Sequence, residues 1–226
     1  ASIDDFRVYT RELVQTEVYG LYFNKSGAKT QTHQIPTHQL FVDNSRTDIY
    51  TQDGTLIKPF KTIQSAIDSI TDSSVSNSYE IKIISGSNYI ENLNINKDYI
   101  TLSFSEAMRN VGLRGNISIT GNNVVFSNVT FLGESNAVKN CTLTINSTTQ
   151  KTLLFRYCFI KYSNFNFVCS DEQLLSYLRF FDCDIQNSIL SLRGFKKELS
   201  AIGGFIQEST ITIQESNFDL TSSNVK

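Results

Sequence analysis

Six copies of one short pattern, spaced about two dozen residues apart, constrain the fold of this chain more than any other feature. Each copy starts with a polar or β-branched residue and continues with an apolar, a small polar and a second apolar residue. The copies are residues 92–95, 116–119, 142–145, 164–167, 189–192 and 210–213. Alternation with period two is typical of a half-buried strand, and its recurrence at near-constant spacing predicts a stack of repeats.

A second pattern accompanies the first and predicts a bend inside each repeat. It reads Phe-x-x-Val-x-Phe at 126–131, Phe-x-x-Cys-x-Ile at 155–160 and 180–185, and more loosely Ile-x-x-Phe at 202–205. The third position holds Asn128, Tyr157, Asp182 and Gly204. Asn, Asp and Gly tolerate left-handed backbone angles, so we expect a sharp bend there, with Tyr157 as an exception.

Together the patterns predict an all-β fold, a right-handed parallel β-helix of about six coils over residues 62–218. One coil cannot bury its apolar face alone, but coils stacked about 4.8 Å apart pair their backbones and enclose a continuous core. The expected core columns are Ile117, Leu143, Phe165, Leu190 and Ile211, and beside them Ile119, Ile145, Phe167, Leu192 and Ile213. A β-sandwich fits less well, because its strands alternate in direction.

A short amphipathic helix is expected to close the N-terminal end of the solenoid. Ile63, Ala66, Ile67 and Ile70 fall on one helical face, and Thr62 is suited to be the N-cap. Insertions vary the length of the coils at residues 132–140 and, after the first pattern, at 146–152, 169–177 and 193–200. Stacking would place the last three loops on one side, where repeat proteins often bind ligands.

Charge and cysteine usage exclude several classes of function. The formal net charge is −2 and the 20 basic residues are scattered, which argues against a nucleic-acid partner, and no apolar run is long enough for membrane insertion. The only Met is Met108 and residue 1 is Ala, so we expect a piece of a longer protein.

The four cysteines, at positions 141, 158, 169 and 183, form no CxxC motif, and both histidines lie far upstream. We therefore expect no metal site, no cofactor and buried free thiols, with a disulfide between Cys158 and Cys183 as the alternative.

Several motifs at the start of the repeats resemble those of a known superfamily. Asp53-Gly-Thr, the segment 58–68 (KPFKTIQSAID), Ile81-Lys-Ile, Gly86 and the segment 89–91 resemble the opening of pectin-lyase-like right-handed β-helix proteins, and the resemblance extends over about residues 41–220. That superfamily includes polysaccharide lyases, pectin methylesterases, polygalacturonases and many virus tailspike and fibre proteins.

The first residues resemble something else. Residues 3–13 and 17–22 are similar to the last strand and tail of a laminin-G or concanavalin-like jelly roll. The resemblance implies a domain order with a jelly-roll tail at 1–24, a polar linker at 25–40 and the β-helix at 41–226.

Candidate site residues are few. The polygalacturonase Gly-His-Gly signature is absent, since no His follows residue 38. Asp182 and Asp184, two apart on an expected strand, would lie about 7 Å apart, within the range of glycosidase carboxylates. The alternative is a turn residue beside a solvated one. Residues on neighbouring coils that could contact a glycan are Arg156, Tyr157, Lys161, Tyr162 and Glu208.

We therefore expect a structural and adhesive module of a virion surface, such as a fibre, tail or capsid protein, rather than an enzyme. Its expected partners are other virion proteins and host or capsule glycans, and a homotrimer driven by exposed Phe and Ile columns is a further expectation. The alternatives are a polysaccharide lyase or glycoside hydrolase acting near Asp182 and Asp184, and an extracellular bacterial surface adhesin.

Overall fold

A computed structural model describes residues 36–105, 111–169, 177–195, 198–214, 216, 218–221 and 224–225. These belong to one unit, which spans residues 36–226. The predicted jelly-roll tail at 1–24 and most of the predicted linker lie outside the described residues. The first strand of the solenoid begins at His38, within the range 25–40 predicted for the linker.

The strands form three parallel sheets, which we name A, B and C. Sheet A contains β1 (His38–Asp43), β2 (Tyr79–Ser85), β5 (Ile100–Phe104), β7 (Val124–Ser127), β10 (Thr152–Arg156), β13 (Tyr177–Phe181), β16 (Glu198–Ile202) and β19 (Phe218–Thr221). Sheet B contains β3 (Tyr89–Ile90), the first half of β6 (Gly112–Ile119), β8 (Thr130–Leu132), β11 (Phe159–Lys161), β14 (Asp184–Gln186), β17 (Phe205–Gln207) and β20 (Asn224–Val225). Sheet C contains β4 (Leu93–Ile95), the second half of β6, β9 (Cys141–Ser147), β12 (Ser163–Cys169), β15 (Ile189–Arg193) and β18 (Thr210–Gln214).

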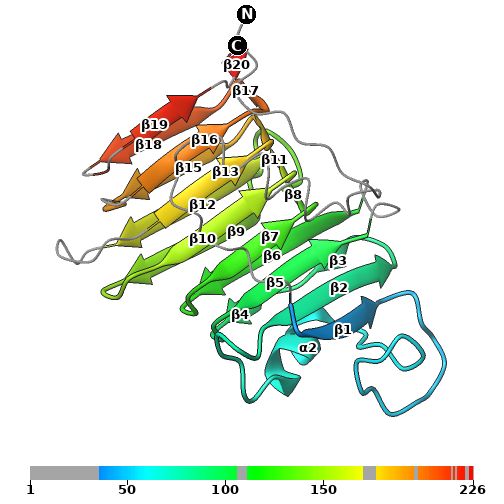
Figure 1. Cartoon of the computed structure of the whole chain (residues 1–226). Helices are drawn as coiled ribbons and strands as arrows, with labels where there is room; N and C mark the ends of the chain where they lie inside the picture. Colours follow the sequence, from blue (N-terminus) through cyan, green and yellow to red (C-terminus); the bar gives the residue numbers. More distant parts are fainter. Residues whose placement is uncertain are drawn as a thin grey trace, which may run out of the picture. The chain divides into compact units, whose positions relative to one another are not determined.

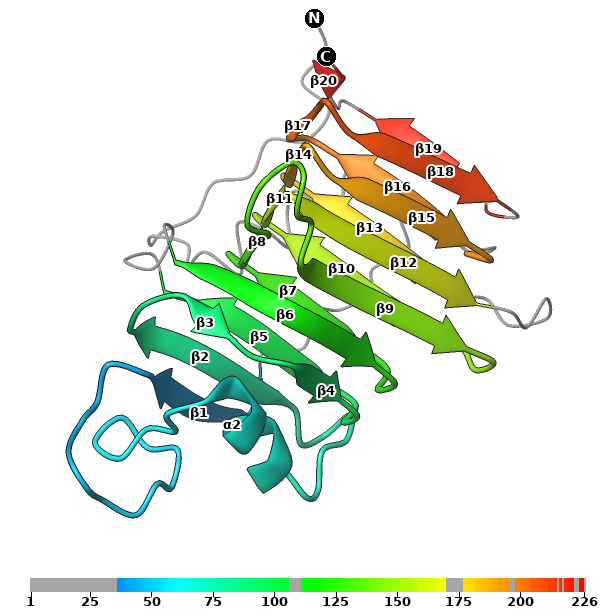
Figure 2. The same ribbon diagram turned by 180° about the vertical axis from the view of Figure 1, so that it is seen from behind.

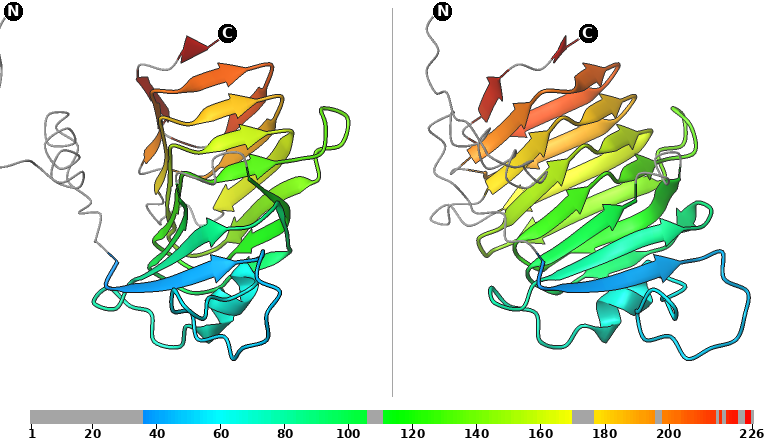
Figure 3. Two further views of the ribbon diagram at one scale, coloured as in Figure 1. Left: turned by 90° about the vertical axis from the view of Figure 1, so that its right-hand side faces the viewer. Right: turned by 45° about the vertical axis from the view of Figure 1, so that its right-hand side comes forward.

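The chain passes through sheets A, B and C in turn six times, from β2–β3–β4 to β16–β17–β18 (Figure 1). Every pairing between neighbouring coils is parallel, for example Phe165 of β12 opposite Leu143 of β9 and Leu190 of β15. The predicted parallel β-helix and its approximate number of coils are therefore confirmed. The layers of successive coils can be followed in Figure 3 by their colours.

The core is built from columns of like side chains. Phe126, Phe155 and Phe180 stack face to face through consecutive coils of sheet A, with ring centroids 4.9 Å apart at both steps. Phe131 and Phe165 contact Phe155 from the other two sheets, and all of these rings are buried. The side chains that the first pattern predicts to face inward are buried in each coil as far along the chain as Leu192. Ile211 and Ile213, in the following coil, are half-buried.

Left-handed residues turn the chain from one sheet to the next. At the bend between sheets A and B, the AB bend, Asn128, Tyr157 and Asp182 have φ angles of 56°, 54° and 46°. Tyr157 is therefore no exception to the predicted bend. The alignment of the fourth repeat was wrong by one residue, because Phe181 pairs with Ile202 and this places Gly203, rather than Gly204, beside Asp182.

The bends are further fixed by small side chains that donate to backbone carbonyls inside the coil. At the bend between sheets B and C, the BC bend, the hydroxyls of Ser163, Ser188 and Ser209 each donate to two carbonyls, and the Ser188 hydroxyl accepts the N–H of Ser163 at 3.2 Å. At the AB bend the Cys158 thiol donates to the carbonyls of Phe126 and Arg156. Carbonyls such as those of Arg156, Lys161 and Gln186, which already accept a backbone N–H from a neighbouring coil, thereby gain a second donor.

The predicted helix is α2 (Ile63–Ser69), which lies across the N-terminal end of the solenoid (Figure 3). Its Ile63, Ala66 and Ile67 are at most 1% exposed, and the Thr62 side chain accepts the N–H of Ser65 as the N-cap. The Glu91 carboxylate also accepts the N–H groups of Ile63 and Gln64, both at 3.1 Å. One side chain from the first coil thus anchors the capping helix.

The variable loops lie where stacking predicts. Residues 148–151 and the described residues 194 and 195 follow sheet C strands on the side that leads to sheet A, as predicted; the remaining loop residues, 170–176 and 196–197, lie outside the described residues. The Phe and Ile columns form the core, so they do not provide the exposed surface expected to drive a homotrimer, which itself stays a prediction.

Replacing Phe155 with Ala should lower the free energy of unfolding by about 3–5 kcal/mol, because it opens a cavity in the middle of the ring stack. Urea unfolding followed by circular dichroism measures the change. Thr144→Ala, on the exposed side of the preceding coil, is the control and should change stability by less than about 0.5 kcal/mol. Similar costs for the two variants would contradict the assigned core.

Glu91→Ala should lower the free energy of unfolding by about 1–2 kcal/mol more than Glu91→Gln does, because only the Gln variant keeps an acceptor for the helix N–H groups.

Burial raises the pKa of the Glu91 carboxyl. A raised folded-state pKa gives stability that is complete below the unfolded pKa and is lost as pH rises through the folded one. Wild type should therefore lose stability relative to Glu91→Gln as the pH of the urea titration rises from acidic to neutral; the opposite trend would contradict the assignment.

Candidate functional site

The residues predicted to form a binding site are divided between two bends. Arg156, Tyr157 and Asp182 lie at or next to the AB bend, while Lys161 ends β11 and Tyr162 forms the BC bend. The three-residue strand β11 separates the two bends, which corresponds to about 10 Å. The predicted residues therefore border sheet B from opposite sides and do not form one cluster.

At the AB bend, the predicted contact residues are partly withdrawn from solvent. Arg156 is only 9% exposed, so little of its side chain is accessible for the predicted glycan contact. Tyr157 is half-buried, and its ring packs edge-on against Phe181 at 5.6 Å. Arg156 and Tyr157 thus contribute mainly to packing around the bend.

At the BC bend, Lys161 and Tyr162 are half-buried like Tyr157, and Glu208 is exposed. The ammonium of Lys161 lies 4.9 Å from the centroid of the Tyr162 ring, which is a cation–π distance. Tyr162 and Glu208 both have left-handed backbones, with φ of 53° and 49°, and Glu208 is exposed. These side chains project along the edge that sheet B shares with sheet C.

The carboxylate pair takes a different form from the one that the spacing predicts. Asp182 forms the left-handed AB bend and only Asp184 belongs to β14, so the two do not alternate along one strand. Asp184 Oδ1 accepts the N–H of Phe205 in the next coil at 3.0 Å. Asp184 therefore has a structural role in joining two coils, and the alternative of a turn residue beside a strand residue describes the pair better.

The outer face of sheet C is the feature that the search for site residues missed. Its strands lie side by side in Figure 2. Three outward columns run along it in register, and the third contains Asn146, Val168, Arg193 and Gln214. The first column is Asn116, Thr142, Asn164, Ile189 and Thr210, and the second is Asn94, Ser118, Thr144, Asn166, Ser191 and Thr212. Apart from the half-buried Thr142 and Ser191, all side chains of the first two columns are exposed.

These two columns carry no charge, and every member except Ile189 is a short hydroxyl or amide side chain. Hydroxyls and amides both donate and accept hydrogen bonds. Neighbouring coils repeat such groups every 4.7–4.9 Å or so along the solenoid, and alternate residues repeat them about every 7 Å across it. The two columns are thus a regular array of neutral hydrogen-bonding groups, which we name the sheet C face; the charged Arg193 lies beside them in the third column.

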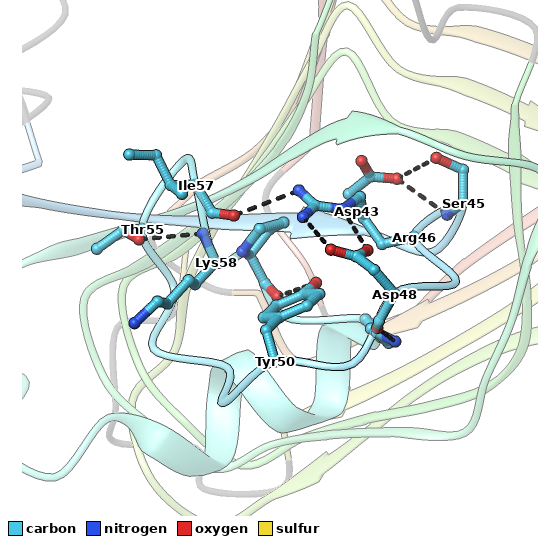
Figure 4. Close-up of polar contacts among 10 residues, drawn as sticks. Asp43, Ser45, Arg46, Asp48, Tyr50, Thr55, Ile57 and Lys58 are labelled. Atoms are coloured by element: carbon cyan, nitrogen blue, oxygen red, sulfur yellow. Dashed lines mark hydrogen bonds and ion pairs between the residues drawn. The ribbon is translucent and has the colours of Figure 1, made fainter.

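The longest connection between described elements, the β1–α2 loop at residues 44–62, is a second candidate. Figure 4 shows its internal contacts. Arg46 forms two hydrogen bonds with Asp48, at 2.8 and 2.7 Å, and these hold the pKa of Asp48 well below its usual range. The cations of Arg46 and Lys61 lie 4.8 and 5.2 Å from the Tyr50 ring centroid. These contacts all lie within the loop, so they stabilise its conformation and do not indicate a ligand.

Metal and membrane sites are not found in the described part of the chain. Within it, no group of three or more His, Cys, Asp or Glu side chains converges, and no helix is long and apolar enough to cross a membrane.

The four thiols are free and buried, as expected, and Cys158 and Cys183 form no disulfide. Burial raises the pKa of Cys141 to about 11, so its reactive thiolate is disfavoured.

Comparisons with protein-family models, with curated proteins and with solved structures returned no match. The resemblances to pectin-lyase-like proteins and to a jelly roll therefore stay predictions. The fold and the sheet C face are established by this chain's own residues alone.

Asp184→Ala should lower the free energy of unfolding by about 1 kcal/mol, because the N–H of Phe205 loses its acceptor. Asp184→Asn keeps an acceptor oxygen and is the matched control, which should retain most of the stability. Urea unfolding of the three proteins provides the comparison. If both variants were as stable as wild type, the structural role given to Asp184 would be wrong.

Proposed function

We propose that this chain is a structural and adhesive module of a virion surface, and that it holds a neutral glycan on the sheet C face. The observation that carries the glycan proposal is the uncharged array of Asn, Thr and Ser side chains in register over successive coils. The virion assignment has a separate basis, which is the resemblance of residues 41–220 to tailspike and fibre proteins.

The chemistry of the face suits a carbohydrate polymer. Sugar hydroxyls need partners that both donate and accept, and short Asn, Thr and Ser side chains provide them at a small cost in side-chain entropy. A charged array would favour an ionic ligand, and the two columns contain no ionic side chain. A neutral polysaccharide therefore fits this face better than an acidic one does.

The rigidity of the scaffold supports the same proposal. Each outward side chain of the face alternates with a buried one, such as Leu143 and Ile145 on either side of Thr144, so the array is held in place by the core. A preorganised array loses little conformational entropy on binding, which favours affinity. At the BC edge, Lys161 and Tyr162 offer an aromatic ring beside the array for stacking on a sugar.

Binding can be measured by affinity electrophoresis in gels that contain a soluble neutral polysaccharide, such as a glucan or galactomannan, or an acidic one, such as polygalacturonate or alginate. We expect neutral polysaccharides to retard the wild-type protein. Asn166→Lys and Thr144→Lys should each raise the Kd for the polysaccharide, obtained from the retardation, about tenfold. A long charged side chain removes hydrogen bonds worth about 1.4 kcal/mol. Gln39→Lys, at an exposed position of β1 in sheet A, adds the same charge away from the face and should not weaken binding.

Two outcomes would contradict the proposal. If none of the polysaccharides retarded the protein, the proposal that the sheet C face binds a glycan would be wrong. Release of reducing ends or unsaturated sugars by wild type, lost on combining Asp182→Ala with Asp184→Ala, would instead support the enzymatic alternative.

A further inference from the structure

The sheet C face differs from the outward surfaces of the other two sheets in its lack of charge. Outward positions of sheet A include Lys82 and Arg179, and those of sheet B include Lys161 and Asp184. The two columns of the sheet C face contain only Asn, Thr, Ser and one Ile, and Arg193 stands outside them in the third column. Charged groups are costly to separate from their hydration water, whereas neutral groups are much less so. Water over this face can therefore take up an order that the face itself imposes.

The columns form a two-dimensional lattice. The pairings from β4 through β6, β9, β12 and β15 to β18 run in continuous register, and these strands lie side by side in Figure 2. Neighbours within a column are about 4.8 Å apart, and the two columns are about 7 Å apart. Hydrogen-bonding groups thus recur at fixed intervals in two perpendicular directions.

The groups of this lattice are held stiffly. The Thr142 hydroxyl donates to Asn116 Oδ1 in the preceding coil at 2.8 Å, so these two side chains fix each other. Thr is restricted at χ1, and Thr144 lies between the fully buried Leu143 and Ile145. Binding of a periodic ligand would therefore cost little side-chain entropy.

We propose that the sheet C face also binds crystalline water, so that the protein adsorbs to the prism face of ice. The ice lattice repeats on that face at two perpendicular spacings, which are close to the spacing of the coils and to that of the columns. Water molecules bonded to the Thr, Ser and Asn groups can therefore occupy lattice positions over several coils at once. This activity uses the same face as the proposed glycan site and does not depend on glycan binding.

Nanolitre osmometry of the full 226-residue chain, without polysaccharide, tests the proposal. We expect the freezing temperature to fall below the melting temperature, with faceted crystals between the two. Thr144→Tyr and Asn166→Tyr each raise a ring above the array, which should abolish the gap between the two temperatures. Gln39→Tyr adds the same ring at an exposed position of β1 and should keep the gap. Circular dichroism establishes that the variants fold.

Adsorption of fluorescently labelled protein to a single ice crystal gives a second readout, and we expect it to mark the prism faces. The absence of a gap in wild type, an equal gap in Thr144→Tyr and Gln39→Tyr, or adsorption to the basal face alone would overturn the proposal.

The glycan proposal is tested separately, because a neutral ring can stack on a sugar and the Tyr variants should still be retarded in polysaccharide gels. Ice adsorption without any retardation would contradict only the glycan proposal, and retardation without ice adsorption would contradict only this one.

Discussion

The parallel register between coils is the interaction on which the rest of this structure depends. It places Phe126 under Phe155 and Phe155 under Phe180, and the same register sets Asn166 beside Thr144 on the outside. Backbone hydrogen bonds fix the spacing, and the apolar columns fix which side of each strand faces inward. A slip of one residue would bury the polar columns and expose the rings, so core and surface are specified together.

The bends preserve this register where the strands end. Left-handed residues turn the chain within one or two positions, and the Ser163, Ser188 and Ser209 hydroxyls donate to backbone carbonyls at the bend. Tyr162 and Glu208 occupy left-handed positions although their side chains are bulkier than those usually found there. The tertiary structure therefore imposes these angles, and outward side chains at the bends become available for contacts.

The repeat made the fold predictable, because few folds besides a stacked solenoid produce period-two alternation that recurs at near-constant spacing. The capping helix followed from Ile63, Ala66 and Ile67. The site was harder to predict. Arg156 and Tyr157 look exposed in sequence, yet outward positions of sheet A and the AB bend are packed. Asp182 and Asp184 look like a pair only if the bend between them is ignored. The sheet C face was visible as the polar positions of the first pattern, but uncharged residues carry no catalytic signature and drew no attention.

Nuclear Overhauser contacts between methyl and ring protons test the central claim, vertical register, most directly. With methyl-labelled Leu and protonated Phe in an otherwise deuterated background, the account predicts contacts from Leu143 and from Leu190 to the Phe165 ring, because Phe165 lies between them in adjacent coils. It also predicts none from Leu143 to the Leu132 side chain, which faces outward from sheet B. Contacts from Leu143 to an antiparallel neighbour, or rapid solvent exchange at these strands, would contradict the stacked parallel coil.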